Sequence, residues 1–389
     1  MPVTCTRLCF SASHTDHILI NASHLDKLIL NTRHLDKPHL SATQLDKVLF
    51  SASHVDNNFI SASQFYKPLL SVSHLSNFIL NVSILYKPRI NASHLHKVQL
   101  FDSKLDSLII NASHLLRPLL TASHEDNLLL NASHLDKVLL TAIHLDNHFL
   151  NASDLHKPHL STSRLGSLIL NASHLDKLIL NGNNLDKTQL SSSPMESFIL
   201  NSNDLHKAVL SASHTDNILV NACQLGMHLL NASHLDKLIL NAIHLDKPLL
   251  TASNLDSLIL NARHLDKPHL SATQLDQALL SASHVDNHFL NASQFYKPLL
   301  SVSHLYNFIL NVSNFYKPRI NASHCHKAQL FDSKLDSLIL NASPLHKALL
   351  STSELDKLLL NASHLDKALL SASHLDTFFS MPVTCTTFF

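Results

Sequence analysis

The sequence predicts an all-β fold, an elongated β-solenoid in which two copies of a ten-residue repeat, about 20 residues, form each coil. Three observations lead to this prediction. Residues 11–380 divide into 37 consecutive decads without an insertion or deletion. Apolar residues recur at fixed places within the decad and alternate there with polar ones. One decad supplies one strand and one bend, which cannot close a coil, whereas two decads can.

The decad has the consensus Asn-Ala-Ser-His-Leu-Asp-Lys-Leu-Ile-Leu, which stands intact at 21–30, 171–180 and 231–240. Its positions are numbered 1 to 10, so that Leu180 is at position 10. Position 10 is apolar in 36 of the 37 decads and position 5 in 34. The exceptions are Ser380 at position 10 and Thr15, Glu125 and Thr215 at position 5. Positions 5 and 10 are therefore expected to form the core.

The decad fits a strand and not a helix. Ten residues at about 100° each fall roughly 80° short of whole helical turns, so an apolar stripe would soon leave any common face. Nine decads have proline at position 8, and each would cost about 3 kcal/mol inside a helix. In a strand, positions 8, 10 and 2 point inward while 9 and 1 point outward. We expect about 18–19 coils at about 4.8 Å per layer, roughly 90 Å in all.

Positions 3–7, Ser-His-Leu-Asp-Lys, are expected to form the bend, with the leucine at position 5 turned back into the core. The chain has only 3 glycines. Asn, Asp, Ser and His tolerate left-handed backbone better than most residues, which allows the chain to turn without glycine. A 20-residue rhythm supports the doubled coil, because histidine occupies position 4 in alternate decads from 34 to 114 while Gln44, Gln64, Ile84 and Lys104 stand between.

The predicted organisation is a degenerate N-terminal cap at 1–10, a solenoid at 11–380 and a C-terminal tail at 381–389. Within the solenoid, residues 31–120 reappear at 261–350 with 17 differences in 90. No segment has the composition of an interdomain linker.

Read from position 5, the repeat resembles the leucine-rich-repeat core LxxLxLxxNxL, in its short nested variety. Residues 175–185, LDKLILNGNNL, match that core fully, with Asn183 in the asparagine place. The resemblance implies a right-handed solenoid that binds proteins, and no catalytic residue. The chain departs from the family because it has no variable helical segment and usually has Ser in the asparagine place. Pentapeptide-repeat proteins, a second comparison, fit less well.

Composition narrows the function classes. Lys+Arg 29 against Asp+Glu 29 leaves no basic patch for nucleic acid and no acidic tail. No apolar stretch is long enough for a signal peptide or a membrane span, which favours an intracellular protein. The five cysteines form no CxxC pair and are interpreted as buried or incidental thiols. The 13 Asn-x-Ser/Thr sequons are a by-product of the repeated Asn-Ala-Ser.

Histidine is the most prominent chemical feature, with 32 residues, 20 of them at position 4. Stacked coils would place these imidazoles in rows about 5 Å apart, and two rows could hold Zn²⁺ or Cu²⁺. Copying of one ancestral histidine explains the same count without a function. Neighbouring imidazoles would also disfavour one another's protonation. The recurrent Ser, His and Asp lack a pocket and an oxyanion hole. We therefore expect no catalytic, cofactor-binding or metal-binding residue, and no cofactor.

Position 9 is expected to point outward, yet it is apolar in 29 of the 37 decads. A continuous exposed apolar row is unusual in a monomer. It can be a partner-binding face, a self-association face, or a sign that the inward assignment is wrong. The sequence thus favours a non-enzymatic scaffold with an unknown protein partner or with itself as partner. The alternatives are a translated tandem minisatellite without a selected function, and a weak metal-binding surface made by the histidine rows.

Overall fold

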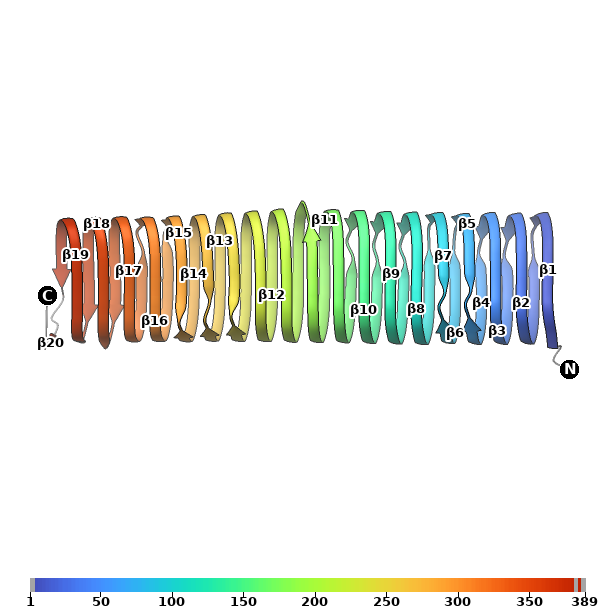
Figure 1. Cartoon of the computed structure of the whole chain (residues 1–389), viewed down its shortest axis with the longest axis horizontal. Helices are drawn as coiled ribbons and strands as arrows, with labels where there is room; N and C mark the ends of the chain where they lie inside the picture. Colours follow the sequence, from blue (N-terminus) through green and yellow to red (C-terminus); the bar gives the residue numbers. More distant parts are fainter. Residues whose placement is uncertain (1–3, 381–383, 386–389) are drawn as a thin grey trace. The chain divides into compact units, whose positions relative to one another are not determined.

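The computed structural model describes residues 4–380 and 384–385. The chain forms two compact units, Met1–Ser193 (unit 1) and Pro194–Phe389 (unit 2). Each unit is a parallel β-solenoid, and the two together hold about 19 turns of about 20 residues. Figure 1 shows the strands of each unit winding as successive coils. The predicted fold class, an all-β solenoid with two decads per coil, is confirmed.

The strands follow the chain from coil to coil. Those of unit 1 are β1 (Thr4–Thr15), β2 (Ile18–Asp36), β3 (Pro38–Asp56), β4 (Asn58–Tyr66), β5 (Leu69–Leu75), β6 (Phe78–Tyr86), β7 (Arg89–Leu95), β8 (Val98–Leu116), β9 (Leu119–Asp136), β10 (Leu139–His156) and β11 (His159–Ser192). Those of unit 2 are β12 (Met195–Asp246), β13 (Pro248–Asp266), β14 (His269–Asp286), β15 (His288–Tyr296), β16 (Pro298–Tyr316), β17 (Arg319–Ala342), β18 (Leu345–Ala362), β19 (His364–Ser380) and β20 (Thr384–Cys385).

The register fixes the coil length. The parallel pairs join each residue to the one 20 positions later, as in Leu140↔Leu160 of unit 1 and Leu250↔Leu270 of unit 2. A coil of one decad would join residues ten apart, which is not what the pairing shows. Pairing continues around the bends, which is why β12 runs through 52 residues. The side chains at each decad position therefore form two rows in each unit. One row comes from the odd-numbered decads and the other from the even-numbered decads.

The inward assignment is also confirmed. Positions 5, 8 and 10 are buried in most decads, and position 2 is buried or half-buried. None of the side chains at position 9 between Leu19 and Leu369 is buried. Two of the exceptions at position 5, Glu125 and Thr215, are nevertheless inside the core at 1% and 0% exposure. The core is thus an apolar interior with a few polar substitutions.

The bends differ in one respect from the expectation. Twelve residues have left-handed backbone, all at position 7, and only Asn57 and Asn287 are of the expected types. The others are Lys37, Lys67, Lys87, Arg117, Lys137, Lys157, Lys247, Lys267, Lys297 and Lys317. Each of the nine prolines at position 8 follows such a residue. The N–H at position 7 still bonds to the next coil, as Lys37 N to Asp56 O at 2.9 Å.

The ends of the described chain keep the same register. Residues 4–10 of the predicted cap lie in β1, with Thr4 paired to His24. In the predicted tail 381–389, β20 pairs Thr384 with His364 and Cys385 with Leu365. The rest of that tail lies outside the described residues.

A pair of adjacent substitutions tests the register directly. Leu180 is fully buried, whereas its neighbour Ile179 is not. Leu180→Asp should destabilise its coil by several kcal/mol, about the cost of burying an unpaired carboxyl group. Ile179→Asp should cost much less, because its side chain reaches solvent. Urea denaturation of the two variants, followed by circular dichroism, measures the difference. A larger loss for Ile179→Asp is the opposite of what the structure requires.

Candidate functional site

Twelve of the histidines at position 4 form two ladders. Ladder 1, in unit 1, contains His14, His34, His54, His74, His94, His114 and His134; neighbouring ring centroids are 4.6–4.8 Å apart and the rings are within 15° of parallel. Ladder 2, in unit 2, contains His244, His264, His284, His304 and His324, at 4.7–4.9 Å and within 21°. The predicted rows of imidazoles about 5 Å apart are therefore present.

Three ladder histidines have a lowered pKa. The pKa of His34 is lowered by desolvation and then by the charges that His14, His54 and Arg33 would place beside it. The pKa of His94 is lowered by the same causes, desolvation and its two ladder neighbours. His264 in ladder 2 has a lowered pKa as well, again with desolvation first. The neutral form of these three imidazoles is therefore favoured.

Stacking makes the ladders poor chelators between neighbours. The ring centroids of His74 and His94 are 4.7 Å apart and the rings are parallel within 3°, so their nitrogen lone pairs lie in parallel planes. A zinc ion lies close to the plane of each imidazole that binds it, about 2.0–2.1 Å from the nitrogen. Neighbouring ladder rings therefore do not converge on one ion.

A different arrangement occurs where ladder 1 ends. In decad 151–160 the usual order is inverted, with Asp154 at position 4 and His156 at position 6. The coil length of 20 residues places Asp154 between His134 and His174, and His156 between Asp136 and Asp176. Imidazoles and carboxylates thereby alternate along both rows. We call His134, Asp154, His156, His174 and Asp176 the His–Asp cluster.

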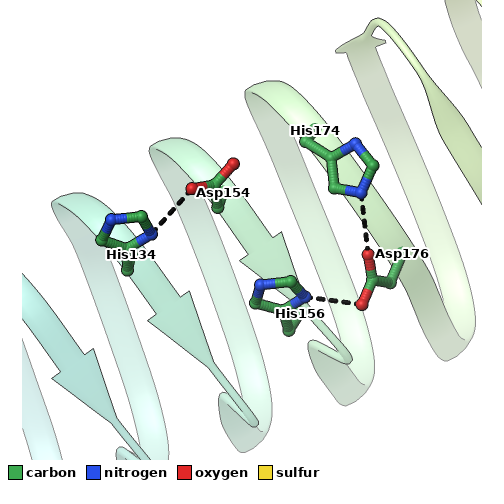
Figure 2. Close-up of polar contacts among 5 residues, drawn as sticks. All are labelled: His134, Asp154, His156, His174 and Asp176. Carbon is green, nitrogen blue, oxygen red and sulfur yellow. Dashed lines mark hydrogen bonds and ion pairs between the residues drawn. The ribbon is translucent and has the colours of Figure 1, made fainter.

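The contacts in the cluster are short. His134 Nδ1 lies 2.7 Å from Asp154 Oδ2. His156 Nδ1 lies 2.5 Å from one oxygen of Asp176, and His174 Nε2 lies 3.1 Å from the other. Figure 2 shows both imidazoles directed at the same carboxylate. The side chains of His156, His174 and Asp176 are 41%, 38% and 22% exposed, so the cluster is open to solvent.

The cluster has the opposite electrostatic character to the ladders. The pKa of His156 is raised, first by its hydrogen bond to Asp176 and then by the negative charges of Asp176, Asp136 and Asp154, against a smaller desolvation effect. The carboxylates of this corner therefore favour the protonated form of His156. The inverted order of Asp154 and His156 is visible in the sequence, but it does not predict the cluster by itself. It becomes a cluster only once the 20-residue offset is known.

The residues at position 9 form rows that are mostly apolar, with polar residues at a few places such as Arg89. In unit 1 the register joins the members of row 29–169, which are Ile29, Leu49, Leu69, Arg89, Ile109, Leu129, Phe149 and Ile169. Several position-9 side chains are strongly exposed, among them Leu19 at 77% and Leu369 at 52%. Because the inward assignment is correct, the explanation of these rows as an error of register is excluded.

Beside these rows run shallow polar troughs lined by positions 1–3. One in unit 1 has a volume of about 730 Å³ between residues 51 and 151, and one in unit 2 about 920 Å³ between residues 262 and 363. Their rims carry amide ladders, as in Asn111 Nδ2 donating to Asn91 Oδ1 at 3.0 Å. These contacts tie successive coils together.

The cysteines lie apart from one another. Cys9 and Cys223 are free and exposed, and Cys325 is buried. Burial raises the pKa of the Cys325 thiol to about 12, which makes it unreactive. The side chains of Cys5 and Cys385 are outside the described part of the chain.

The fold and these surfaces define a tandem-repeat protein of the parallel β-solenoid class. The chain matches no protein-family model, no curated protein and no solved structure. Within the described residues, no helix is long and apolar enough to cross a membrane.

Proposed function

We propose that this protein is a non-enzymatic scaffold that makes protein–protein contacts through its apolar rows. The observation that carries the proposal is the outward, unburied position of row 29–169 and its counterparts. Monomeric proteins rarely expose contiguous apolar patches larger than a few hundred Å², and larger patches commonly mark interaction sites. The resemblance to the short nested leucine-rich repeat, whose family binds proteins, points the same way.

A second copy of the chain is the simplest partner. The flat apolar rows are complementary to themselves, and a formal net charge of zero leaves little repulsion between copies. A different protein with an apolar face of similar length would use the same rows. Solenoids commonly bind along such extended surfaces, because each repeat contributes a similar contact.

Charged substitutions in row 29–169 test the proposal. Ile109→Lys combined with Leu129→Lys should abolish concentration-dependent association, because it places two charges in the centre of the row. Sedimentation velocity over a range of chain concentrations measures the association. The matched control is Asn111→Lys with Asn131→Lys, which adds the same charge on the same coils at position 1. Self-association through this row is refuted if both variants associate like the unmodified chain, or if the unmodified chain is monomeric throughout.

A translated minisatellite without a selected role remains the second candidate, and one observation favours it. Polar residues stand at buried positions without a site around them, such as His228 and His288 at position 8. Selection for stability removes such residues. The nucleotide sequence distinguishes the candidates: an excess of silent over replacement changes at positions 5 and 10 supports a selected protein, and equality supports the minisatellite.

A further inference from the structure

We propose that a second copy of the chain packs on row 29–169 in the antiparallel direction, about a two-fold axis that crosses the row between Arg89 and Ile109. This inference rests on the proposed function, because it concerns the same row and names the partner and its orientation. The observation that carries it is the distribution of charge beside the row.

A second row of side chains runs next to row 29–169. In β2, β3 and β8 to β11 the residues at positions 7 and 9 flank the buried position 8, so their side chains leave the same face of the coil. The register stacks position 7 along the coils, as in Lys27↔Lys47 and Asn127↔Asn147. None of these side chains is buried. We call them the flanking row, which consists of Lys27, Lys47, Lys67, Lys87, Ser107, Asn127, Asn147 and Ser167.

The flanking row changes its charge halfway along. Its first four members are lysines and its last four are uncharged. Arg89, the one charged residue of row 29–169, lies beside the basic half. No Asp or Glu stands at position 7 or 9 in any of the 37 decads. Neither row therefore supplies an anion to offset these cations when a partner covers them, and a second copy brings the same cations with it.

The antiparallel two-fold arrangement keeps the cations of the two copies apart. A two-fold interface brings the same surface of both copies together. With the axis between Arg89 and Ile109, the basic half of each flanking row faces the uncharged half of the other, in the pairs Lys27–Ser167, Lys47–Asn147, Lys67–Asn127 and Lys87–Ser107. In row 29–169 the same axis sets Leu69 against Leu129, so apolar side chains cover apolar side chains. Arg89 faces Ile109, where its aliphatic stem packs while its guanidinium group reaches solvent.

Other placements of the axis oppose like charges, which costs affinity. An axis on the coil of Arg89 sets that guanidinium group against its own copy. An axis on the coil of Ile109 sets Lys27 against Lys187, the position-7 residue of the next coil. The proposed axis opposes like charges only beyond the ends of the row, where the exposed Arg7 and Lys187 are screened by salt.

The remaining part of this face favours contact along the same two rows. Positions 1–3 of these strands form the polar trough between residues 51 and 151. Its lining is mainly alanine and serine, which are shorter than the side chains of row 29–169. A parallel pairing would lay row 29–169 against this polar trough, whereas the antiparallel pairing lays trough against trough and apolar row against apolar row.

Charge substitutions in the uncharged half of the flanking row test the orientation. Sedimentation equilibrium of the full-length chain measures the dimer dissociation constant. Asn127→Lys with Asn147→Lys sets lysines against Lys67 and Lys47 of the second copy and should weaken the dimer about tenfold or more, because the axis repeats both repulsive pairs. Asn127→Asp with Asn147→Asp sets carboxylates against the same lysines and should tighten the dimer at low salt. Adding Lys47→Asn and Lys67→Asn to the lysine variant should restore the affinity, since the charges have only exchanged halves.

The matched control makes the same changes at Asn57 and Asn77, which stand at position 7 in the alternate decads, away from row 29–169. They share the amide contact of the tested pair: Asn77 Nδ2 donates to Asn57 Oδ1 at 2.9 Å, as Asn147 Nδ2 does to Asn127 Oδ1 at 3.3 Å. The control should leave the dissociation constant unchanged, and circular dichroism verifies that every variant keeps its strand content.

The outcomes separate this orientation from the scaffold function. If the lysine and aspartate variants shift the affinity in the same direction, if neither shifts it, or if the control has an equal effect, the antiparallel orientation is wrong. The scaffold function then still stands, provided that Ile109→Lys with Leu129→Lys abolishes association. A chain that stays monomeric at all concentrations refutes both self-association through the row and its orientation.

Discussion

Replacing His228 and His288 by leucine is expected to protect the chain against acid, by about 6 kcal/mol in total near pH 4. Both side chains lie in the core of unit 2 at position 8, at 7% and 3% exposure. Desolvation lowers the pKa of each imidazole from 6.5 to about 4. For His228, a contact with Gly226 O opposes the lowering. For His288, the charge of His269 lowers the pKa further. The imidazoles therefore stay neutral in the fold while the unfolded chain protonates them.

The sign of the pH dependence follows from these two pKa values. Between about pH 6.5 and pH 4 the unfolded chain binds two more protons than the folded one, so stability falls as pH falls. Each shift corresponds to about 3 kcal/mol, and the sites lie three coils apart, so their effects should add. Below about pH 4 both states are protonated at these sites and the loss stops. Above pH 6.5 only the smaller gain from removing unpaired buried nitrogens, about 1–3 kcal/mol each, remains.

Urea denaturation of the unmodified chain and the double variant at pH 7.5 and pH 4 measures this, with hydrogen exchange to locate it in unit 2. Other groups titrate in the same range: His264 acts in the same direction, while Asp332, whose pKa burial raises to about 7, acts in the opposite one. Both are present in both proteins, so the difference isolates His228 and His288. His374→Leu, at an exposed position outside the ladders, is the control and should change little. A difference in stability that does not grow on acidification is incompatible with neutral buried imidazoles.

The coil could be read from the sequence because its core positions are so regular. Inward leucines can alternate with outward residues along the chain in a strand but not in a helix. One decad supplies one strand and one bend, which cannot close a coil. The alternation of histidine with Gln44 and Gln64 then indicated the 20-residue unit. Once the offset of 20 is known, the ladders and rows follow by counting.

Two features could not be read in the same way. Left-handed backbone falls mostly on lysine at position 7, although Asn, Asp and His are the residue types that favour it. The His–Asp cluster depends on contacts between coils, which no inspection of a single decad reveals.

The second large effect concerns a buried ionisable pair in unit 1. Glu125 at position 5 and His148 at position 8 have no exposed side-chain surface, and His148 Nε2 lies 3.4 Å from Glu125 Oε2. Register places Glu125 opposite Leu145 and His148 opposite Leu128. None of the four side-chain polar atoms of this pair, Glu125 Oε1 and Oε2 and His148 Nδ1 and Nε2, has a hydrogen-bond partner. Burial, with a contribution from Glu125, also raises the pKa of Asp102 to about 7.

Replacing both members of this pair with the consensus leucine should stabilise unit 1 by about 1–4 kcal/mol, because desolvation of a buried ion pair commonly exceeds its attraction.

Replacing only one member of the pair should destabilise unit 1. His148→Leu leaves the Glu125 carboxyl group alone in an apolar core and should cost about 3–5 kcal/mol. Glu125→Leu should also cost stability, because it leaves the His148 imidazole buried without a partner. The four proteins form a double-mutant cycle, measured by urea denaturation and by hydrogen exchange of residues 119–156. Since Leu stands at these positions in the consensus decad, the surrounding coils already fit it. A double variant less stable than the unmodified chain would mean that the pair stabilises the core. In that case these two polar residues would be selected and not merely tolerated.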